Sequence, residues 1–253
     1  MVLDEFILTD QVALVVGASS ASGRAIVAAL SEAGADIAAV AGAGADLEGV
    51  ATEVRGQGRR FVALHGDLTD PDQVQAMVDR AHAEFGMIDI LVNNQQVQFA
   101  KPLLETEPAE LREAMDINLT STFLFCKAVG RLMVERRQGK IVNVASGMGD
   151  RGLPNSAAYS ATMAGIMQLT SALSVEWGAF GVKVNAAGPM WLQSEGDDSQ
   201  TGGQPDPVLR YIPMRRKGTW EELANMVHFL ACDGAHFLTG KTVFLDGGVL
   251  SHA

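Results

Sequence analysis

The stretch QVALVVGASSASG (residues 11–23) decides the fold of this chain. Its first half is a short apolar run rich in valine, which is typical of a buried β-strand. Its second half consists of small residues between Gly17 and Gly23, and a helical periodicity follows and ends at Gly34. Because glycine allows a chain to turn tightly, the stretch predicts a strand, a tight turn and a helix in direct succession.

The same alternation of short apolar runs and longer helical segments continues along the chain. Further strands are expected at residues 36–40, 61–64, 88–92, 140–144, 182–186 and 242–245. Helices are expected at residues 24–32, 46–55, from Pro71 with Asp70 as N-cap, 110–136, and 156–177 capped by Asn155 or Ser156. Most of the strand segments are apolar throughout, which indicates strands buried on both faces of a parallel sheet. The pattern predicts one α/β domain over residues 1–253, with a Rossmann-like, doubly wound parallel sheet of about seven strands flanked by helices.

Ligands of such folds bind beyond the carboxyl ends of the strands, so the residues that follow each strand hold the functional information. The least regular segment of the chain, residues 190–213, is rich in Gly, Pro, Asp and Ser. A long irregular loop at this edge of a sheet is typical of a substrate loop.

Composition restricts the classes of function. The chain has 253 residues, 47% of them hydrophobic, which is enough for one sizeable core. Its formal net charge of −11 disfavours nucleic acid and anionic membranes as partners. No apolar run approaches the ~20 residues of a membrane span, and the first residues lack the basic region of a signal peptide. Two cysteines, Cys126 and Cys232, are expected to be reduced thiols in a cytoplasmic protein.

Several motifs follow the expected strands in a specific order. VGASSASG (16–23) follows the first strand, and NNQQ (93–96) follows the fourth. Ser146 follows the fifth, Tyr159 comes thirteen residues later, and FLDGG (244–248) lies near the end. Together with Asn118 in MDINLTSTF, these motifs resemble the short-chain dehydrogenase/reductase family over essentially the whole chain. The resemblance implies a single-domain, nucleotide-binding oxidoreductase.

The resemblance also implies roles for the polar residues of the site. In that family a tyrosine is the general acid/base, a serine holds the substrate oxygen, and an asparagine positions a water molecule for proton relay. These roles would fall on Tyr159, Ser146 and Asn118. A lone helical tyrosine is more often a packing residue, and a lone helical asparagine more often lies on a surface. The spacing of Tyr159 from Ser146 favours a functional site.

Met163 occupies the place of the family's catalytic lysine, four residues after the tyrosine. That lysine binds the nicotinamide ribose and lowers the tyrosine pKa. Methionine has no charge and cannot perform this electrostatic task. We expect Met163 to be a structural residue that faces a pocket of low polarity.

The cofactor side keeps some family features and lacks others. Val16 and Ala21 replace a threonine and a glycine of the family's glycine motif, and no acid or base stands at the end of strand two, at Ala41 and Gly42. The resemblance implies NAD or NADP as cofactor, weakly supported, with no cofactor as an alternative. The expected cofactor-binding residues are Gly17, Ser19, Ser20, Ser22, Gly23, Asp67, Leu68, Asn93 and Pro189. The alternative to cofactor binding is that residues 17–23 form a tight turn without a ligand and that Asp67 is a loop residue without a binding role.

The expected substrate pocket is largely apolar, which favours a hydrophobic carbonyl, alcohol or cyclic substrate. Arg151 could anchor a carboxylate or remain a solvated loop residue. The residues expected to line the pocket are Gln96, Met148, Arg151, Leu153, Met163, Met190 and Trp191. No metal site is expected.

Three functions are compatible with these residues. The first is an NAD(P)-dependent oxidoreductase that acts through a Ser–Tyr dyad. The second is a non-redox enzyme on the same scaffold, a lyase, isomerase, dehydratase or dehalogenase-like protein, because GPMWLQSE (188–195) also resembles the halide-binding segment of halohydrin dehalogenases. The third is a binding subunit without catalysis, which the joint presence of Ser146 and Tyr159 disfavours.

A homo-oligomer is expected, either a dimer or a tetramer. The helix expected at 156–177 has small and apolar residues over more than one face. Such a helix must bury one face against the sheet and another against a partner. The family resemblance also places its dimer-forming helices at 110–136 and 156–177.

Overall fold

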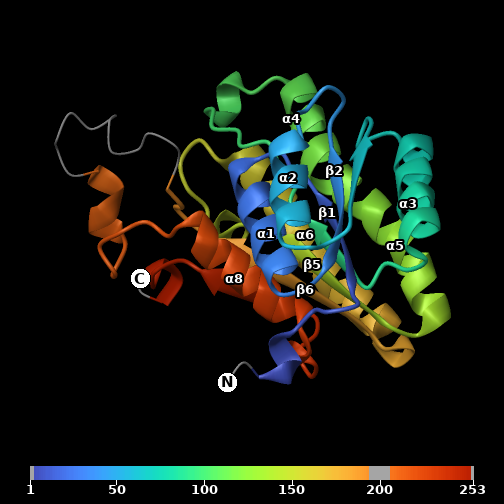
Figure 1. Ribbon diagram of the computed structural model, residues 1–253. Coiled ribbons are helices and arrows are strands. Elements are labelled where there is room, and N and C mark those ends of the chain that lie inside the picture. Colours follow the sequence, from blue (N-terminus) through green and yellow to red (C-terminus); the bar gives the residue numbers. More distant parts are fainter. Residues whose placement is uncertain (1–2, 194–205, 252–253) are drawn as a thin grey trace.

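The computed structural model describes residues 3–193 and 206–251, and within them the fold is a parallel sheet of seven strands between two layers of helices (Figure 1). The strand order is β3-β2-β1-β4-β5-β6-β7. The strands are β1 (Val12–Val16), β2 (Asp36–Ala41), β3 (Phe61–His65), β4 (Ile90–Asn93), β5 (Gly139–Val144), β6 (Val182–Pro189) and β7 (Thr242–Leu245). The expected doubly wound α/β architecture is confirmed, and the order reverses between β1 and β4.

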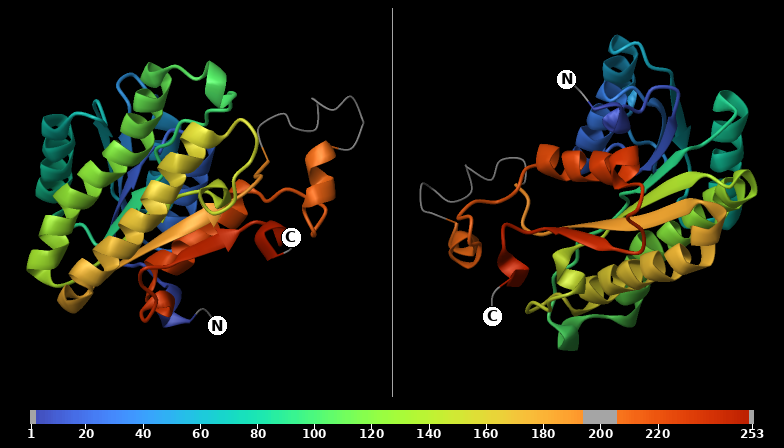
Figure 2. Two further views of the ribbon diagram at one scale, coloured as in Figure 1. Left: turned by 180° about the vertical axis from the view of Figure 1, so that it is seen from behind. Right: turned by 90° about the horizontal axis from the view of Figure 1, so that it is seen from below.

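Helices cover both faces of the sheet, as the two views of Figure 2 show. Helices α1, α2 and α8 lie on one face, and α3, α5 and α6 lie on the other. Their bounds are α1 (Ala21–Glu32), α2 (Glu48–Gly56), α3 (Pro71–Phe85), α4 (Pro108–Met115), α5 (Ser121–Arg136), α6 (Ala157–Trp177) and α8 (Trp220–Ala231).

Alternation of side chains along β1 explains why its whole sequence is apolar. Ala13 and Val15 join the core cluster under α1 and α8. Val12, Leu14 and Val16 join the cluster under α3 and α5. Successive side chains of a strand point to opposite faces, so a strand covered on both sides must be apolar at every position.

Several predicted boundaries shift by a few residues. Helix α1 begins at Ala21, three residues before the expected start, because the Ser20 hydroxyl accepts a hydrogen bond from the Gly23 amide and caps the helix. Asp70 caps α3 as predicted, since its carboxylate accepts from the amides of Asp72 and Gln73. Ser156, one of the two expected caps, is the N-cap residue of α6, but its hydroxyl bonds to Leu153 instead of to an amide of the helix.

The segment expected as one helix over residues 110–136 contains an irregularity. A π-helical turn, Asp116–Thr120, joins α4 to α5. By length and composition the continuous stretch Pro108–Arg136 could cross a membrane, but half of its apolar window is buried inside the protein. A buried core helix passes the same test. The π-helical turn contains Asn118, which is completely buried.

The predicted substrate loop at residues 190–213 falls partly outside the described residues, which exclude 194–205. Among its described residues, Leu192 forms an isolated parallel bridge with Gly218. A short 3-10 helix, Pro207–Tyr211, lies at the other end of the loop. The role of this segment as a substrate loop stays a prediction.

Candidate active site

Ser146 and Tyr159 meet at the carboxyl edge of the sheet. Ser146 follows β5, is 6% exposed, and accepts a hydrogen bond from the Met148 amide at 3.2 Å. Tyr159 lies in the first turn of α6 and is 5% exposed. The chain between them turns through Gly147–Gly149 and returns as α6, as the glycines and Pro154 of this segment indicate.

The Tyr159 hydroxyl takes part in a chain of hydrogen bonds. It donates to the Gln96 side-chain oxygen at 2.7 Å. Burial raises the pKa of Tyr159 to about 12, and hydrogen bonding with the Ser146 hydroxyl acts in the opposite direction. The phenol is therefore protonated at neutral pH and suited to donate a proton rather than to accept one.

Met163 lies one helical turn after Tyr159 and has no exposed surface. It packs in a small apolar cluster with Tyr159, Ala145 and Ile166. The cluster places an uncharged side chain at the position where the family resemblance expects a cation. No charged side chain contributes to the raised pKa of Tyr159 among the described residues.

The side chain of Asn118 makes three hydrogen bonds within the protein. Its oxygen accepts from the Val97 amide at 2.7 Å, and its nitrogen donates to the Val97 carbonyl at 3.1 Å and to the Thr162 hydroxyl at 3.1 Å. The Asn118 carbonyl also accepts from Thr122. Asn118 thus joins the loop after β4 to the helix of Tyr159, and its side chain does not face the site as a free group.

The expected apolar pocket residues come together beside the dyad. Met190 is buried in a cluster with Ile212 and Val249. Residues packed around it are Met148, Leu153, Trp191, Val208, Leu209 and Leu250. Met148 also contacts the cluster of Tyr159 and so joins the two. The buried residues of this cluster come from the segments after β6 and after β7. Short-range sequence patterns do not show that these two segments lie side by side.

Arg151 is exposed, and its guanidinium donates to the Val249 carbonyl at 3.1 Å. That hydrogen bond ties the loop after Ser146 to the segment near the end of the chain. The structure gives Arg151 a structural contact rather than a position in the apolar cluster.

The glycine turn after β1 is held by close backbone packing. Gly17 has a φ of +76°, and a Cβ there would lie 3.0 Å from backbone atoms of Asn94. A Cβ at Gly23 would lie 2.1 Å from the Gly17 carbonyl oxygen. Side chains cannot be accommodated at either position without moving the backbone, whereas Ala21 is half-buried and fits in the place of the family's middle glycine.

The hydroxyls expected to bind phosphate are partly engaged within the protein. Ser20 donates to the Gly17 carbonyl at 2.9 Å, and Ser22 donates to the Asn94 side chain at 3.2 Å. The Asn94 amide also donates to Ser20 at 3.2 Å. Asn94 was not among the predicted site residues; the polar doublet NN directly after an apolar strand was the signal for it.

Three backbone amides at the start of α1 have no hydrogen-bond acceptor among the described residues, those of Ser19, Ala21 and Ser22. Free amides at a helix N-terminus favour an anion. The turn therefore fits the diphosphate of a dinucleotide. The end of the site near Tyr159 fits a dinucleotide less well, because the buried Met163 supplies no cation for a nicotinamide ribose.

The remaining cofactor residues lie along the same sheet edge. Asp67 is exposed after β3, and hydrogen bonds from the amide and hydroxyl of Thr69 lower its pKa. Leu68 is buried beside it. Beyond β2, a Cβ at Gly42 would meet nothing within 4 Å, so the place of a ribose-binding side chain is open.

Two cofactor candidates are buried, each at the end of a strand that has neighbours on both sides. The Asn93 side chain donates to Asn143 at 2.8 Å and to Cys126, and its side-chain oxygen is buried without a hydrogen-bond partner in the part of the chain that the structure describes. Pro189 ends β6, where it pairs with Leu245 of β7. Within the described residues no cluster of three or more His, Cys, Asp or Glu side chains could hold a metal ion.

Comparison with known proteins agrees with this architecture. Residues 17–250 match a family model described as enoyl-(acyl carrier protein) reductase. A 3-oxoacyl-[acyl-carrier-protein] reductase of Synechocystis sp. is 34% identical, with 96% of this chain and 98% of that protein covered.

Solved structures match over nearly the whole chain. A gluconate 5-dehydrogenase of Burkholderia cenocepacia in complex with NADP and tartrate is 31% identical with a TM-score of 0.90, covering 99% of both chains. A short-chain type dehydrogenase/reductase of Mycobacterium marinum is 32% identical with a TM-score of 0.90, covering 98% of both chains. On this fold, dyad and glycine turn, the chain belongs to the short-chain dehydrogenase/reductase family of NAD(P)-dependent oxidoreductases.

Proposed function

We propose that this protein reduces a hydrophobic ketone with NADH or NADPH through a Ser146–Tyr159 dyad. The observation that supports this direction is the buried, protonated phenol of Tyr159, whose pKa is raised to about 12. When bound, the reduced nicotinamide supplies the hydride. Ser146 holds the substrate oxygen, and Tyr159 donates the proton as negative charge develops on that oxygen. Oxidation of an alcohol needs the phenolate, whose fraction rises tenfold per pH unit below the pKa.

The apolar cluster around Met190 supports a hydrophobic substrate. Met148, Leu153 and Trp191 pack against this cluster, beside the dyad. Arg151 donates to a backbone carbonyl, so we do not assign it a substrate carboxylate. The residues 190–213 form the substrate loop in this proposal.

The protein is, in this proposal, an atypical member in which Met163 replaces the catalytic lysine. This replacement affects cofactor binding as well as the pKa of Tyr159, because Met163 has no ammonium group to bind the nicotinamide ribose. Gly17, Ser19, Ser20, Ser22, Gly23, Asp67, Leu68, Asn93 and Pro189 are proposed to hold the cofactor. The end of β2 offers neither an acid for a 2′-hydroxyl nor a base for a 2′-phosphate.

We predict weak cofactor binding with little choice between NADH and NADPH. A charged hydrogen bond contributes ~1.5–3 kcal/mol, so its absence should leave a discrimination of roughly tenfold or less. Titration with each nucleotide, followed by nicotinamide fluorescence, measures both affinities.

Two results of that titration would contradict the proposal. Tight binding of one nucleotide and none of the other would mean that a ribose determinant lies elsewhere. Binding of neither would favour the non-redox alternative, including the dehalogenase-like chemistry to which GPMWLQSE (188–195) is similar. Ketone-dependent oxidation of NADPH, assayed with a panel of hydrophobic ketones, tests the reaction itself.

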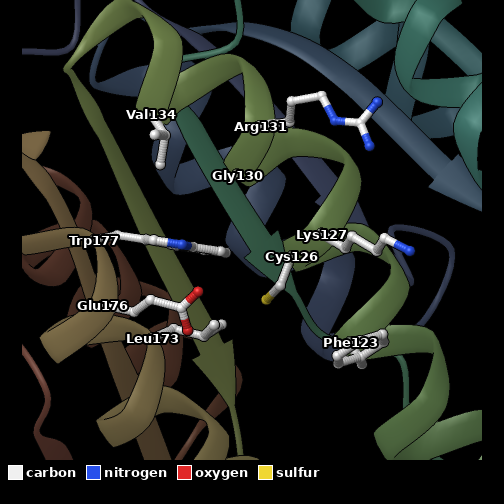
Figure 3. Close-up of a pocket in the computed structure, with 9 residues that line it drawn as sticks. All are labelled: Phe123, Cys126, Lys127, Gly130, Arg131, Val134, Leu173, Glu176 and Trp177. Atoms are coloured by element: carbon white, nitrogen blue, oxygen red, sulfur yellow. The ribbon is translucent and has the colours of Figure 1, made fainter.

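The groove between α5 and α6 supports a dimer interface (Figure 3). Its residues are Phe123, Cys126, Lys127, Gly130, Arg131, Val134, Leu173, Glu176 and Trp177. Phe123, which lines the groove, is 48% exposed. The groove contains both cations and an acid, so a second copy related by a two-fold axis can pair Arg131 with the partner's acid and bury the apolar surface. We propose a second copy of the chain as its occupant, in a dimer or a tetramer.

We predict that Phe123→Glu will lower the oligomeric state. A carboxylate placed in an apolar interface loses its hydration on association, and pairing with Lys127 one helical turn away is equally available in the free monomer, so it does not favour the dimer. Light scattering at micromolar concentration should show a dimer or tetramer for the natural protein and a smaller mass for the variant. Leu104→Glu is the matched control, because Leu104 is fully exposed on a short 3-10 helix far from the groove in sequence. A monomeric natural protein would contradict the assignment.

We also propose a cytoplasmic location. Cys126 and Cys232 are free, buried thiols. Burial raises the pKa of Cys126 to about 12, which makes it an unreactive structural thiol. Such thiols are compatible with a reducing compartment.

A further inference from the structure

The hydrogen bond between Tyr159 and Gln96 links two segments that are far apart in the sequence. The Tyr159 hydroxyl donates to Gln96 Oε1 at 2.7 Å across 63 positions. Gln96 lies in the loop after β4, three residues beyond the last residue of that strand. The side chain is half-buried, so the contact is not a chance encounter on an open surface.

The backbone directly after Gln96 is held in place by two hydrogen bonds. Asn118 holds the next residue, Val97, through its amide at 2.7 Å and its carbonyl at 3.1 Å. Asn118 in turn donates to Thr162, whose hydroxyl donates to the Tyr159 carbonyl at 2.7 Å. The loop with Gln96 is therefore joined to the helix of Tyr159 by a second, independent set of hydrogen bonds, which positions the glutamine before any ligand arrives.

The side-chain amide of Gln96 presents the same kind of hydrogen-bond acceptor to Tyr159 as a ketone substrate would. An amide carbonyl and a ketone carbonyl are both acceptors for a phenol proton. Gln96 Oε1 lies where an acceptor must lie to receive the single proton of Tyr159. The hydroxyl has one proton, so it cannot donate fully to Gln96 and to a substrate carbonyl at the same time.

We propose that Gln96 is a positioning residue that holds the Tyr159 hydroxyl in the free protein and competes with the substrate carbonyl for it. The inference rests on the proposed function, because only a carbonyl substrate needs that proton. Burial of Tyr159 and the lack of any charged contribution to its pKa keep the phenol protonated, and so keep it a donor to Gln96. Displacement of Gln96 then precedes proton transfer and leaves the chemical step unchanged.

The contact can be tested without any turnover, because the chain has only two tyrosines. In a Tyr211→Phe background, ¹³Cζ-tyrosine labelling gives one NMR resonance, that of Tyr159. Gln96→Ala should shift this resonance at pH 7 and lower the pKa of Tyr159, since a hydrogen-bond acceptor of the protonated form is lost. Gln95→Ala is the matched control: it removes the same amide from the same loop, and no hydrogen bond joins Gln95 to Tyr159 among the described residues. Circular dichroism verifies the fold of each variant.

Competition is tested with 4-phenyl-2-butanone as the ketone probe, in the presence of NADP⁺, which cannot reduce it. Titration followed by the Tyr159 resonance should show roughly threefold to tenfold tighter ketone binding in Gln96→Ala, the range expected for one neutral hydrogen bond. Equal or weaker binding in the variant, no ketone effect in either protein, or an equal resonance shift in Gln95→Ala would overturn the proposal. If both Gln96 effects appear but no ketone is reduced with NADPH, the proposed function fails instead.

Discussion

Replacing Met163 with lysine is expected to raise the rate of alcohol oxidation at neutral pH by a factor on the order of 10²–10³. An ammonium near Tyr159 favours the ionised phenol, and each unit of pKa lowering is worth ~1.4 kcal/mol. A lowering of two to three units would increase the fraction of active base by that factor. The steady-state rate from pH 6 to 11, compared with the natural protein, measures the change. The rate of alcohol oxidation should begin to rise at a lower pH in the variant than in the natural protein.

The lysine variant should also be less stable. Met163 has no exposed surface and packs against Tyr159 and Ile166, so a charged head group there loses hydration. Thermal unfolding of the natural protein, of Met163→Lys and of Met163→Leu measures the loss of stability. Met163→Leu is the control, because it keeps an apolar side chain of similar volume and should leave the pH profile in place. A folded Met163→Lys protein with no gain in activity with either nicotinamide cofactor would show that the absent lysine is not what limits oxidation.

Tyr159→Phe is expected to reduce ketone reduction by a factor on the order of 10²–10⁴, the range for loss of a general acid. The aromatic ring remains in its cluster, so the fold should survive. The change appears in kcat, because the proton is donated only as the oxygen gains charge. Steady-state kinetics on a ketone that the natural protein reduces measures it.

Tyr211→Phe provides the matched control for this substitution. Tyr211 is 49% exposed, and its hydroxyl accepts from Arg210 rather than facing Ser146. Because Tyr211 lies in the proposed substrate loop, a change in KM would report on that loop, whereas kcat should be close to that of the natural protein. Retained turnover in Tyr159→Phe would remove the dyad from both the redox and the non-redox proposals, since each uses this hydroxyl.

The sequence determined the fold because its signals are local. The valine run before Gly17 is short, apolar at every position and followed by a glycine turn, which together are typical of a strand covered on both faces. Ser146 and Tyr159 could be placed together for a similar reason. One follows a strand and the other begins the next helix, and parallel strands bring such positions to one edge of the sheet. The absence of a cation at Met163 could also be read from the sequence.

The contacts of the polar groups depend on how distant segments pack together. Asn118 belongs to a helical pattern, yet a π-helical turn directs its amide to Val97 and Thr162. Gln96 follows a strand, yet its side chain reaches the Tyr159 hydroxyl across 63 positions. A hydrogen bond requires a donor–acceptor distance correct to a few tenths of an ångström and a suitable angle. Sequence periodicity shows only which face of an element a residue occupies. The sequence therefore determined which residues reach the site edge, and packing of the loop after β4 against α6 decided which of them hold the reactive hydroxyl.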